Sequence, residues 1–453
     1  MTATELKLTE QVARKDFPND FVWGCATSAY QIEGAANCDG KSNSIWDDFC
    51  RQDGAIRDAS NGDIACDHYH RWREDSKLMQ ELGLNSYRFS IAWSRILPQA
   101  NGQINQAGLD FYKRLSDDLL ERGIQPWATL YHWDLPSYLQ QQGGWQNRAT
   151  VDRFVEYADV VSRALGDRVQ HWMTHNEPWC TAMLGHADGI HAPGLRDFKA
   201  ALQVSHHVMT SHGLAIPAIR ANSSAAKIGI ALNLHPVLAA SNDARDQEIC
   251  RLHDGLRNRW YLDPLYGRGY PADVMAALGE LAPTIHASDL QAIAYPMDFL
   301  GVNFYFPEIV RYQPGASPLN TEIILRENVA RTDMGWEICP QMLPDLLARI
   351  QRDYQPQAMY ITENGCSYDD QADQHGNFND YQRRDYVMQH LEAMRNARSQ
   401  GVRVQGYFLW SLLDNFEWAE GYSRRFGICH VDFATQKRSL KASGKWYQNF
   451  LQG

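Results

Sequence analysis

The feature that most constrains the fold of this chain is a repeat of eight short β-favouring runs, separated by helical or looped segments. The runs are residues 21–29, 86–93, 125–134, 169–177, 227–236, 298–305, 357–365 and 404–414. Amphipathic segments lie between them, among others at residues 67–82, 107–122, 150–165 and 379–399. A strand followed by a helix, eight times over, is typical of a parallel barrel. We therefore predict an α/β fold, a single (β/α)8 TIM barrel with long βα loops.

The length of the chain is compatible with one domain. It has 453 residues, 44% of them hydrophobic, and α/β barrels with insertions reach this size as one unit. No Pro/Ser-rich linker, low-complexity tract or change of composition marks a boundary. We predict one catalytic domain over residues 1–453, with residues 1–15 as a flexible N-terminal segment.

Composition excludes several classes of partner. The formal net charge of −11 disfavours nucleic acid. The polar N-terminus has no apolar core typical of a secretory signal, and no apolar run is long enough to span a bilayer. The nine cysteines are scattered and form no C-x-x-C pair, which indicates reduced, mostly structural thiols in a cytoplasmic protein. Oligomeric state stays open between a monomer and a homo-oligomer.

The chain also lacks convincing motifs for a metal or a cofactor. There is no H-E-x-x-H, and His206, His207 and His212 lie in a helical segment where packing is the better interpretation. Gly267-Arg268-Gly269 lacks the third glycine and the strand–turn–helix context of a dinucleotide loop. There is no G-x-x-x-x-G-K-[ST] loop. We therefore predict no metal and no cofactor.

Nearly all of the β-favouring runs begin apolar and end in polar or aromatic residues. The ends are residues 131–134, 175–177, 303–305, 362–364 and 410–414. In a (β/α)8 barrel the C-terminal ends of all strands open onto one face, where the active site lies. We therefore expect these side chains to converge, although they are far apart in sequence.

Two of these strand ends carry a glutamate. Glu363, in "YITENG", precedes an Asn-Gly turn, and Glu177, in "HWMTHNEPW", precedes Pro178, which blocks regular continuation. A charged group at the end of a buried strand is costly unless it is paired, hydrogen-bonded or used. Two structural glutamates in salt bridges are one interpretation. The other is glycoside hydrolysis, in which one carboxyl group protonates the leaving oxygen while the second attacks carbon or activates water.

The surroundings of the two glutamates suggest how the roles divide. A general acid must stay protonated near neutral pH, which burial and a nearby carboxylate favour. We assign this role to Glu177, beside Asn176, whose amide can bind a sugar hydroxyl without adding charge. Glu363 is then the group that must be ionised before it attacks.

Five stretches, in this order and spacing, carry a resemblance to a known family: "FVWGCATSAYQIEG", "WMTHNEP", "GVNFYFP", "YITENG" and "FLWSLLDNFEWAEGYSRRFGICHVDF". The chain resembles glycoside hydrolase family 1, the β-glucosidase family, over nearly its whole length. The resemblance implies a retaining β-glycosidase with Glu177 as acid/base and Glu363 as nucleophile. Tyr305 would support the nucleophile, and Asn303 would lie beside it as one of the substrate-binding residues.

The resemblance also implies substrate-binding positions. The glycone pocket would contain Gln31, His132, Asn176, Glu363, Glu417 and Trp418, with Trp410 as its stacking floor and Phe426 as one wall. Trp336 would be a platform for the aglycone, and Trp179 and Leu184 would form a gate. Ordinary core or loop packing is the alternative for each aromatic residue taken alone, and Gln31 alone would be read as a solvated loop residue.

The activity that the resemblance implies is release of terminal, non-reducing β-linked glucose from cellobiose and from aryl and alkyl glucosides. β-Galactosidase and β-fucosidase side activities and transglycosylation are expected as well. An intact Glu417-Trp418 pair favours non-phosphorylated sugars, since a carboxylate there would repel phosphate, and Glu177 argues against the family's thioglucosidases, which carry Gln at that position. The rival class is a catalytically silent sugar-binding barrel, which would normally have lost one carboxylate.

Overall fold

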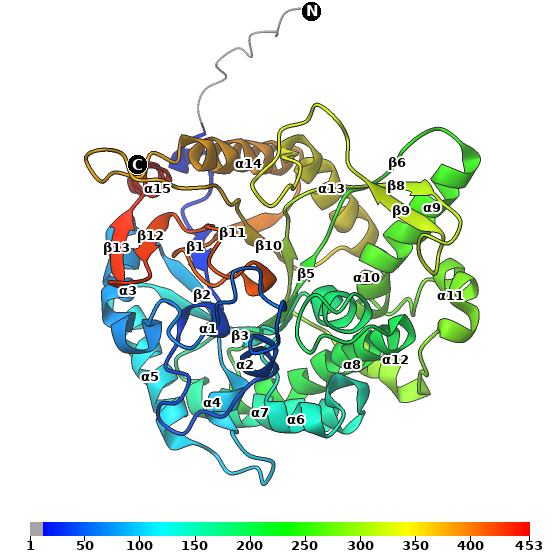
Figure 1. Cartoon of the computed structure of the whole chain (residues 1–453), viewed down its shortest axis with the longest axis horizontal. Helices are drawn as coiled ribbons and strands as arrows, with labels where there is room; N and C mark the ends of the chain where they lie inside the picture. Colours follow the sequence, from blue (N-terminus) through cyan, green and yellow to red (C-terminus); the bar gives the residue numbers. More distant parts are fainter. Residues whose placement is uncertain (1–11) are drawn as a thin grey trace, which may run out of the picture.

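A computed structural model describes residues 12–453 and contains a closed barrel of eight parallel strands (Figure 1). The strands are β1 (Val22–Ala26), β2 (Ser86–Ser90), β3 (Gln125–Tyr131), β4 (His171–Asn176), β5 (Lys227–Asn233), β7 (Phe299–Asn303), β10 (Met359–Asn364) and β11 (Val404–Trp410). Around the barrel their order is β1-β11-β10-β7-β5-β4-β3-β2. Each strand lies inside one of the eight predicted runs, so the (β/α)8 prediction is confirmed.

Helices surround the strands (Figure 1). The longer ones are α3 (His68–Leu82), α5 (Gln106–Glu121), α7 (Ala149–Leu165), α8 (Phe198–Asn222), α9 (Ala244–Asp254), α13 (Leu343–Tyr354), α14 (Tyr381–Ser399) and α15 (Ala442–Gln452). The four predicted amphipathic segments correspond to α3, α5, α7 and α14. In α5, for example, Leu109, Tyr112 and Leu115 are buried at helical spacing. Within residues 12–453, none of the helices has the combination of length and apolarity that crossing a membrane requires.

The predicted packing of the three histidines on α8 is also confirmed. His206, His207 and His212 are all buried. His206 contacts Asp289 of α12 (Ala287–Ile293), and His212 contacts the hydroxyl of Thr174 on β4 at 2.7 Å. These rings therefore tie α8 to its neighbours.

The βα loops carry two small sheets that periodicity did not reveal. One contains β6 (Val237–Ala239), β8 (Glu308–Tyr312) and β9 (Thr321–Ile324), and the other pairs β12 (Cys429–Asp432) with β13 (Lys437–Leu440). They lie on opposite sides of the barrel (Figure 1). Two π-helical segments, η3 (Cys180–Ala187) and η4 (Gly255–Arg259), follow β4 and α9.

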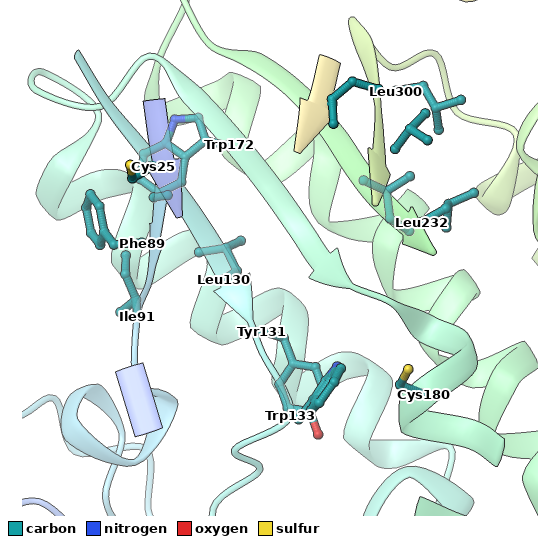
Figure 2. Packing of buried hydrophobic residues seen from close by; sticks show 14 of the residues in the cluster. Cys25, Phe89, Ile91, Leu130, Tyr131, Trp133, Trp172, Cys180, Leu232 and Leu300 are labelled. Atoms are coloured by element: carbon teal, nitrogen blue, oxygen red, sulfur yellow. The ribbon is translucent and has the colours of Figure 1, made fainter. Parts of the chain in front are cut away.

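Successive residues of each strand point to opposite sides of the barrel wall, so they belong to two different apolar clusters. Cys25 and Trp172 face the large cluster between strands and helices (Figure 2), whereas the residues that follow them, Ala26 and Met173, face the barrel interior. Inside, the Trp127 ring lies 4.9–5.5 Å from three other aromatic rings. The interior is therefore a packed core, and the polar site lies toward the C-terminal ends of the strands.

The structure describes part of the expected flexible N-terminal segment. Residues 1–11 of that segment lie outside the described residues. Val12 is buried, and the Arg14 guanidinium donates to the carbonyl oxygen of Pro18 at 3.0 Å. In residues 12–15 an apolar side chain is thus buried and a charged side chain has a partner just before β1, and the flexibility of the segment stays a prediction.

Candidate active site

Both predicted catalytic glutamates stand where their strands become irregular. The β4–β5 ladder shifts register between Met173 and Asn176, and the β10–β7 ladder shifts between Ile361 and Glu363. Such bulges re-aim side chains next to functional sites. Glu177 has a left-handed φ of 49°, which is uncommon for a residue with a side chain. The carboxyl groups of Glu177 and Glu363 line the same cavity.

Glu363 is held by a cation and a hydroxyl group. Arg88, on β2, donates to Oε1 at 2.6 Å, and the hydroxyl of Tyr305 donates to Oε2 at 2.8 Å. The second guanidinium nitrogen of Arg88 donates to Oδ1 of Asn176 at 2.6 Å. Because Arg88 is buried, this ion pair is shielded from water and favours the ionised carboxylate.

Sequence reasoning missed Arg88, although its signal was present. Arg88 lies in the middle of "SYRFS", a run predicted to be a buried strand. A charge in such a place requires a partner, as it does at a strand end. The sequence thus indicates a buried acidic partner for Arg88 without identifying it as Glu363.

Glu177 has neutral hydrogen-bond partners. The side-chain amide of Asn303 donates to Oε1 at 2.7 Å, and the Cys180 thiol lies 3.1 Å from Oε2. Asn303 is itself oriented by the hydroxyl of Thr362, which donates to its Oδ1 at 2.6 Å. One amide thus links β4, β7 and β10.

Burial raises the pKa values of both carboxyl groups. The pKa of Glu363 is raised to about 7 by burial and by the charge of Glu177, although Arg88 and Tyr305 act to lower it. Burial also raises the pKa of Glu177, against smaller lowering effects of Asn303, Cys180, Arg257 and Arg88. Since Arg88 contacts Glu363 directly, it favours the ionised form of Glu363 over that of Glu177.

Aromatic residues and a third carboxyl group form the wall around this pair. Trp410 ends β11, Glu417 and Trp418 follow in the next loop, and all three line the cavity together with His132 and Phe426. The His132 ring lies 5.8 Å from Trp410 and 5.9 Å from Trp418. Burial and the charge of Glu363 raise the pKa of Glu417 to about 8.

Three residues predicted to contact sugar lie one layer behind the cavity wall. Gln31, Asn176 and Asn303 are not among the residues that line it. Each instead bonds to a residue that does. The amide of Gln31 donates to Glu417 at 3.5 Å, that of Asn176 contacts His132 at 3.0 Å, and that of Asn303 donates to Glu177.

The outer part of the cavity contains the predicted platform and gate. Trp336 packs 5.2 Å from Tyr305 and 5.8 Å from Phe426. Trp179 and Leu184 line the same cavity, whose empty volume is about 1100 Å³ when its open mouth is included. That is room for a monosaccharide and a leaving group.

Trp179 is covered by Arg257, a second buried cation that sequence reasoning missed. The guanidinium lies 3.6 Å from the ring centroid and forms an ion pair with Glu308 at 3.2 Å. It is carried by the π-helical segment η4, which directs it toward the cavity. Nothing in the local sequence distinguishes Arg257 from the surface arginines around it.

The Asn-Gly pair after Glu363 has a structural explanation. Asn364 donates to the carbonyl oxygen of Phe304 at 2.7 Å and accepts from the hydroxyl of Tyr407 at 2.8 Å. A Cβ on Gly365 would stand 1.7 Å from the carbonyl oxygen of Trp410. Glycine therefore allows the ends of β10 and β11 to approach, which brings Glu363 and Trp410 into one cavity.

A parallel barrel with two buried glutamates in the cavity at its C-terminal face has the architecture of a glycoside hydrolase. Residues 13–453 match the model of Glycosyl hydrolase family 1, and the chain belongs to this family. It is 48% identical over 442 residues to "Beta-glucosidase A" of Acetivibrio thermocellus, with 96% of this chain and 98% of the relative covered.

Two further relatives extend the comparison. The chain is 40% identical over 459 residues to a "Bifunctional beta-D-glucosidase/beta-D-fucosidase" of Bifidobacterium breve, covering 96% and 98% of the two chains. The crystal structure of the family 1 β-glucosidase from Thermotoga maritima superposes with a TM-score of 0.94 at 43% identity, covering 98% of this chain and 99% of that one.

Proposed function

We propose that this glycoside hydrolase is a retaining β-glucosidase that releases terminal, non-reducing β-D-glucosyl residues from cellobiose and from aryl and alkyl β-glucosides. The observation that carries the proposal is the unequal environment of two carboxyl groups in one cavity. Glu363 has the Arg88 cation at 2.6 Å, whereas the direct donors to Glu177 are an amide and a thiol. The names of the relatives support glucose as the sugar.

In the first step Glu363 attacks the anomeric carbon while Glu177 donates its proton to the glycosidic oxygen. The carbon–oxygen bond to the leaving group breaks, and a covalent glycosyl-enzyme forms. Arg88 and Tyr305 hold the Glu363 carboxylate ionised and oriented until it attacks. Once Glu363 is esterified its negative charge is gone, which lowers the pKa of Glu177 and prepares it for the second step.

In the second step Glu177 acts as a base. It removes a proton from water, the oxygen of which attacks the anomeric carbon, and the bond to Glu363 breaks. Glucose leaves with the β configuration of the substrate, and both carboxyl groups return to their starting states. Any alcohol that enters in place of water gives transglycosylation.

Recognition of the sugar is assigned to the wall residues. Trp410 offers a flat apolar face, and Glu417 can accept two hydroxyl groups. The pocket's other sugar contacts would be His132, Trp418 and Phe426, and Gln31 and Asn176 would orient Glu417 and His132 from behind. A carboxyl group at Glu417 favours a neutral sugar over a phosphorylated one. Side activity on β-fucosides and β-galactosides is part of the proposal, and the bifunctional relative supports the former.

The leaving group would lie on Trp336, with Trp179 and Leu184 at the gate. We further propose that the whole chain is one catalytic domain and acts in the cytoplasm without a nucleic-acid or membrane partner. The family match over residues 13–453 supports the first, and nine cysteines that are all free thiols support the second. A silent sugar-binding barrel is disfavoured, because both carboxyl groups and the Arg88 cation are in place.

The proposal is tested by the product of hydrolysis of an aryl β-glucoside, followed by proton NMR from the first turnovers. β-Glucose is expected as the first product, with the α-anomer appearing later by mutarotation. Initial α-glucose would contradict retention, and no hydrolysis at all would favour the silent barrel.

A further inference from the structure

The two oxygens of the Glu177 carboxyl group have different neighbours. Oε1 accepts the Asn303 amide at 2.7 Å, and an amide N–H can only donate, so Oε1 is always an acceptor. Because the carbonyl oxygen of a carboxyl group is the better acceptor, this contact favours the acid proton on Oε2. The thiol of Cys180 forms a hydrogen bond with Oε2, with the sulfur 3.1 Å away. Cys180 is 6% exposed and lines the cavity.

The thiol of Cys180 has a second acceptor. The Asn233 amide lies 3.4 Å from the sulfur. When this amide is oriented so that its oxygen accepts from Arg257, at 3.1 and 3.3 Å, the same oxygen faces Cys180. A thiol hydrogen rotates freely about its C–S bond, so it can point at either Asn233 or Glu177. Figure 2 shows Cys180 on the helical segment that follows β4.

We propose that Cys180 is a positioning residue whose thiol hydrogen turns toward Oε2 of Glu177 when that carboxyl group loses its proton, and toward Asn233 when the proton returns. The proposal rests on Glu177 being the acid/base of the proposed function. As the proton passes to the leaving oxygen, charge develops on Oε2 and the S–H donor bonds to it more strongly. Charge developed in the transition state is thus stabilised without a charged neighbour.

Other groups around Glu177 do not substitute for this donor. The charged or titratable neighbours are Glu363 on β10, Arg88 on β2, Arg257 on η4, Tyr305 after β7 and Glu417 after β11. Arg88 and Tyr305 direct their hydrogen bonds to Glu363, and Arg257 is paired with Glu308. Burial raises the pKa of the Cys180 thiol well above its usual range, so it stays a donor throughout the working range of pH.

The test compares Cys180→Ala, Cys180→Val and Cys180→Ser with Cys25→Ala, which removes a buried thiol from the far side of β1 (Figure 2). The measurement is kcat/KM for β-glucosides whose leaving groups range from dinitrophenol, which needs no proton, to methanol and glucose, which do. In the Ala and Val variants, kcat/KM for substrates with poor leaving groups is expected to fall about 3- to 10-fold, which corresponds to the loss of one hydrogen bond. The kcat/KM for dinitrophenyl glucoside is expected to change by less than about twofold.

Two further readouts separate donation from packing. The alkaline limb of kcat/KM should move to higher pH by about 0.3–1 unit in Ala and Val, because the donor favours ionised Glu177. The Ser variant, which restores a donor, should keep the alkaline limb at its original pH and should keep the activity on substrates with poor leaving groups. Ala is smaller than Cys and Val is larger, so equal effects of the two variants indicate that the loss of the donor, and not the change in side-chain volume, is the cause.

Equal losses for all leaving groups, or a Ser variant as impaired as Ala, would overturn the inference. The Cys25→Ala control should show neither a leaving-group effect nor a pH shift. Turnover of aryl glucoside by the unaltered protein tests the proposed function separately. If that turnover is present and the Cys180 variants show no leaving-group dependence, only the role of Cys180 is wrong.

Discussion

Arg88 and Glu363 are joined by a hydrogen-bonded ion pair of 2.6 Å in which both side chains are almost inaccessible to solvent. The same guanidinium contacts Asn176, the residue that precedes Glu177. One cation on β2 thus fixes the carboxyl group on β10 and bonds to the side chain of the residue before the other glutamate. The chemistry proposed for this site depends on that unequal distribution of positive charge.

Replacing Arg88 should therefore affect the nucleophile more than the fold. Arg88→Met leaves the Glu363 carboxylate buried and unpaired, which costs about 3–5 kcal/mol unless it takes up a proton. Because Arg88 lowers the pKa of Glu363, its loss raises that pKa and moves the acid limb of the kcat/KM profile to higher pH. A pH–rate profile with an unmoved acid limb would contradict the assignment. Arg122→Met, which removes a surface ion pair with Asp118, is the control.

Loss of the nucleophile should be nearly complete and chemically reversible. Glu363→Gly is expected to lower kcat by several orders of magnitude, and added azide should restore turnover by occupying the vacated space. Azide then attacks the face that Glu363 used, so NMR should show the α-glucosyl azide. A β-product from this variant would mean that the two roles are exchanged.

Loss of the acid/base should depend on the leaving group. Glu177→Ala retains Glu363, so aryl glucosides with good leaving groups should still form the glycosyl-enzyme while alkyl glucosides should not. Azide then replaces water in the second step, and β-glucosyl azide is the expected product. If activity on both substrate classes fell equally, acid catalysis by Glu177 would not be supported.

Activity should follow a bell-shaped dependence on pH. As pH rises, kcat/KM increases while Glu363, whose pKa burial raises to about 7, loses its proton. At still higher pH it decreases as Glu177, whose pKa is also raised, loses the proton that it must donate. A profile without an acid limb near pH 7, the pKa of Glu363, would argue against this pair.

A buried carboxyl group outside the cavity should link stability to pH. Burial raises the pKa of Asp134 to about 8, and its Oδ1 has no protein partner among the described residues. The folded state therefore holds a proton that the unfolded chain releases near pH 4, roughly the ordinary pKa of Asp. Stability is complete below that pH and decreases as pH rises toward 8. Asp134→Asn should remove this dependence and stabilise the protein at pH 8 by roughly 1–3 kcal/mol in denaturant unfolding, whereas exposed Asp53→Asn should not.

The fold was predictable because its signal is repeated. Each of the eight β-favouring runs predicted one strand of a parallel barrel, and the amphipathic segments between them predicted helices. All eight strands lie within the predicted ranges. The small sheet of β6, β8 and β9 was not predictable in this way. Its strands are short, and β6 and most of β9 are only partly buried. β6 and β8 are separated in sequence by α9 to α12 and by β7, so their pairing depends on tertiary contacts.

The site was predictable where a chemical type was unusual for its position. Glu177 and Glu363 are charges at the ends of apolar runs, and the structure brings them together in one cavity. Arg257 and Cys180 gave no such signal, since their positions in the cavity are set by π-helical segments that periodicity does not reveal. Gln31 and Asn176 show a different limit, because sequence identified them without telling whether they face the cavity or support residues that do.

The closure of the barrel between β1 and β11 has a consequence for how the protein acquires activity. Val22 pairs with Gly406 at this seam, and Gln31 bonds to Asn415, which is 384 residues away in the chain. A nascent chain in which β11 has not yet been synthesised possesses Glu177 and Glu363 but neither Trp410 nor Glu417. Catalytic competence should therefore arise late during translation, and a fragment ending before residue 404 should become active only when the missing C-terminal peptide is supplied in trans.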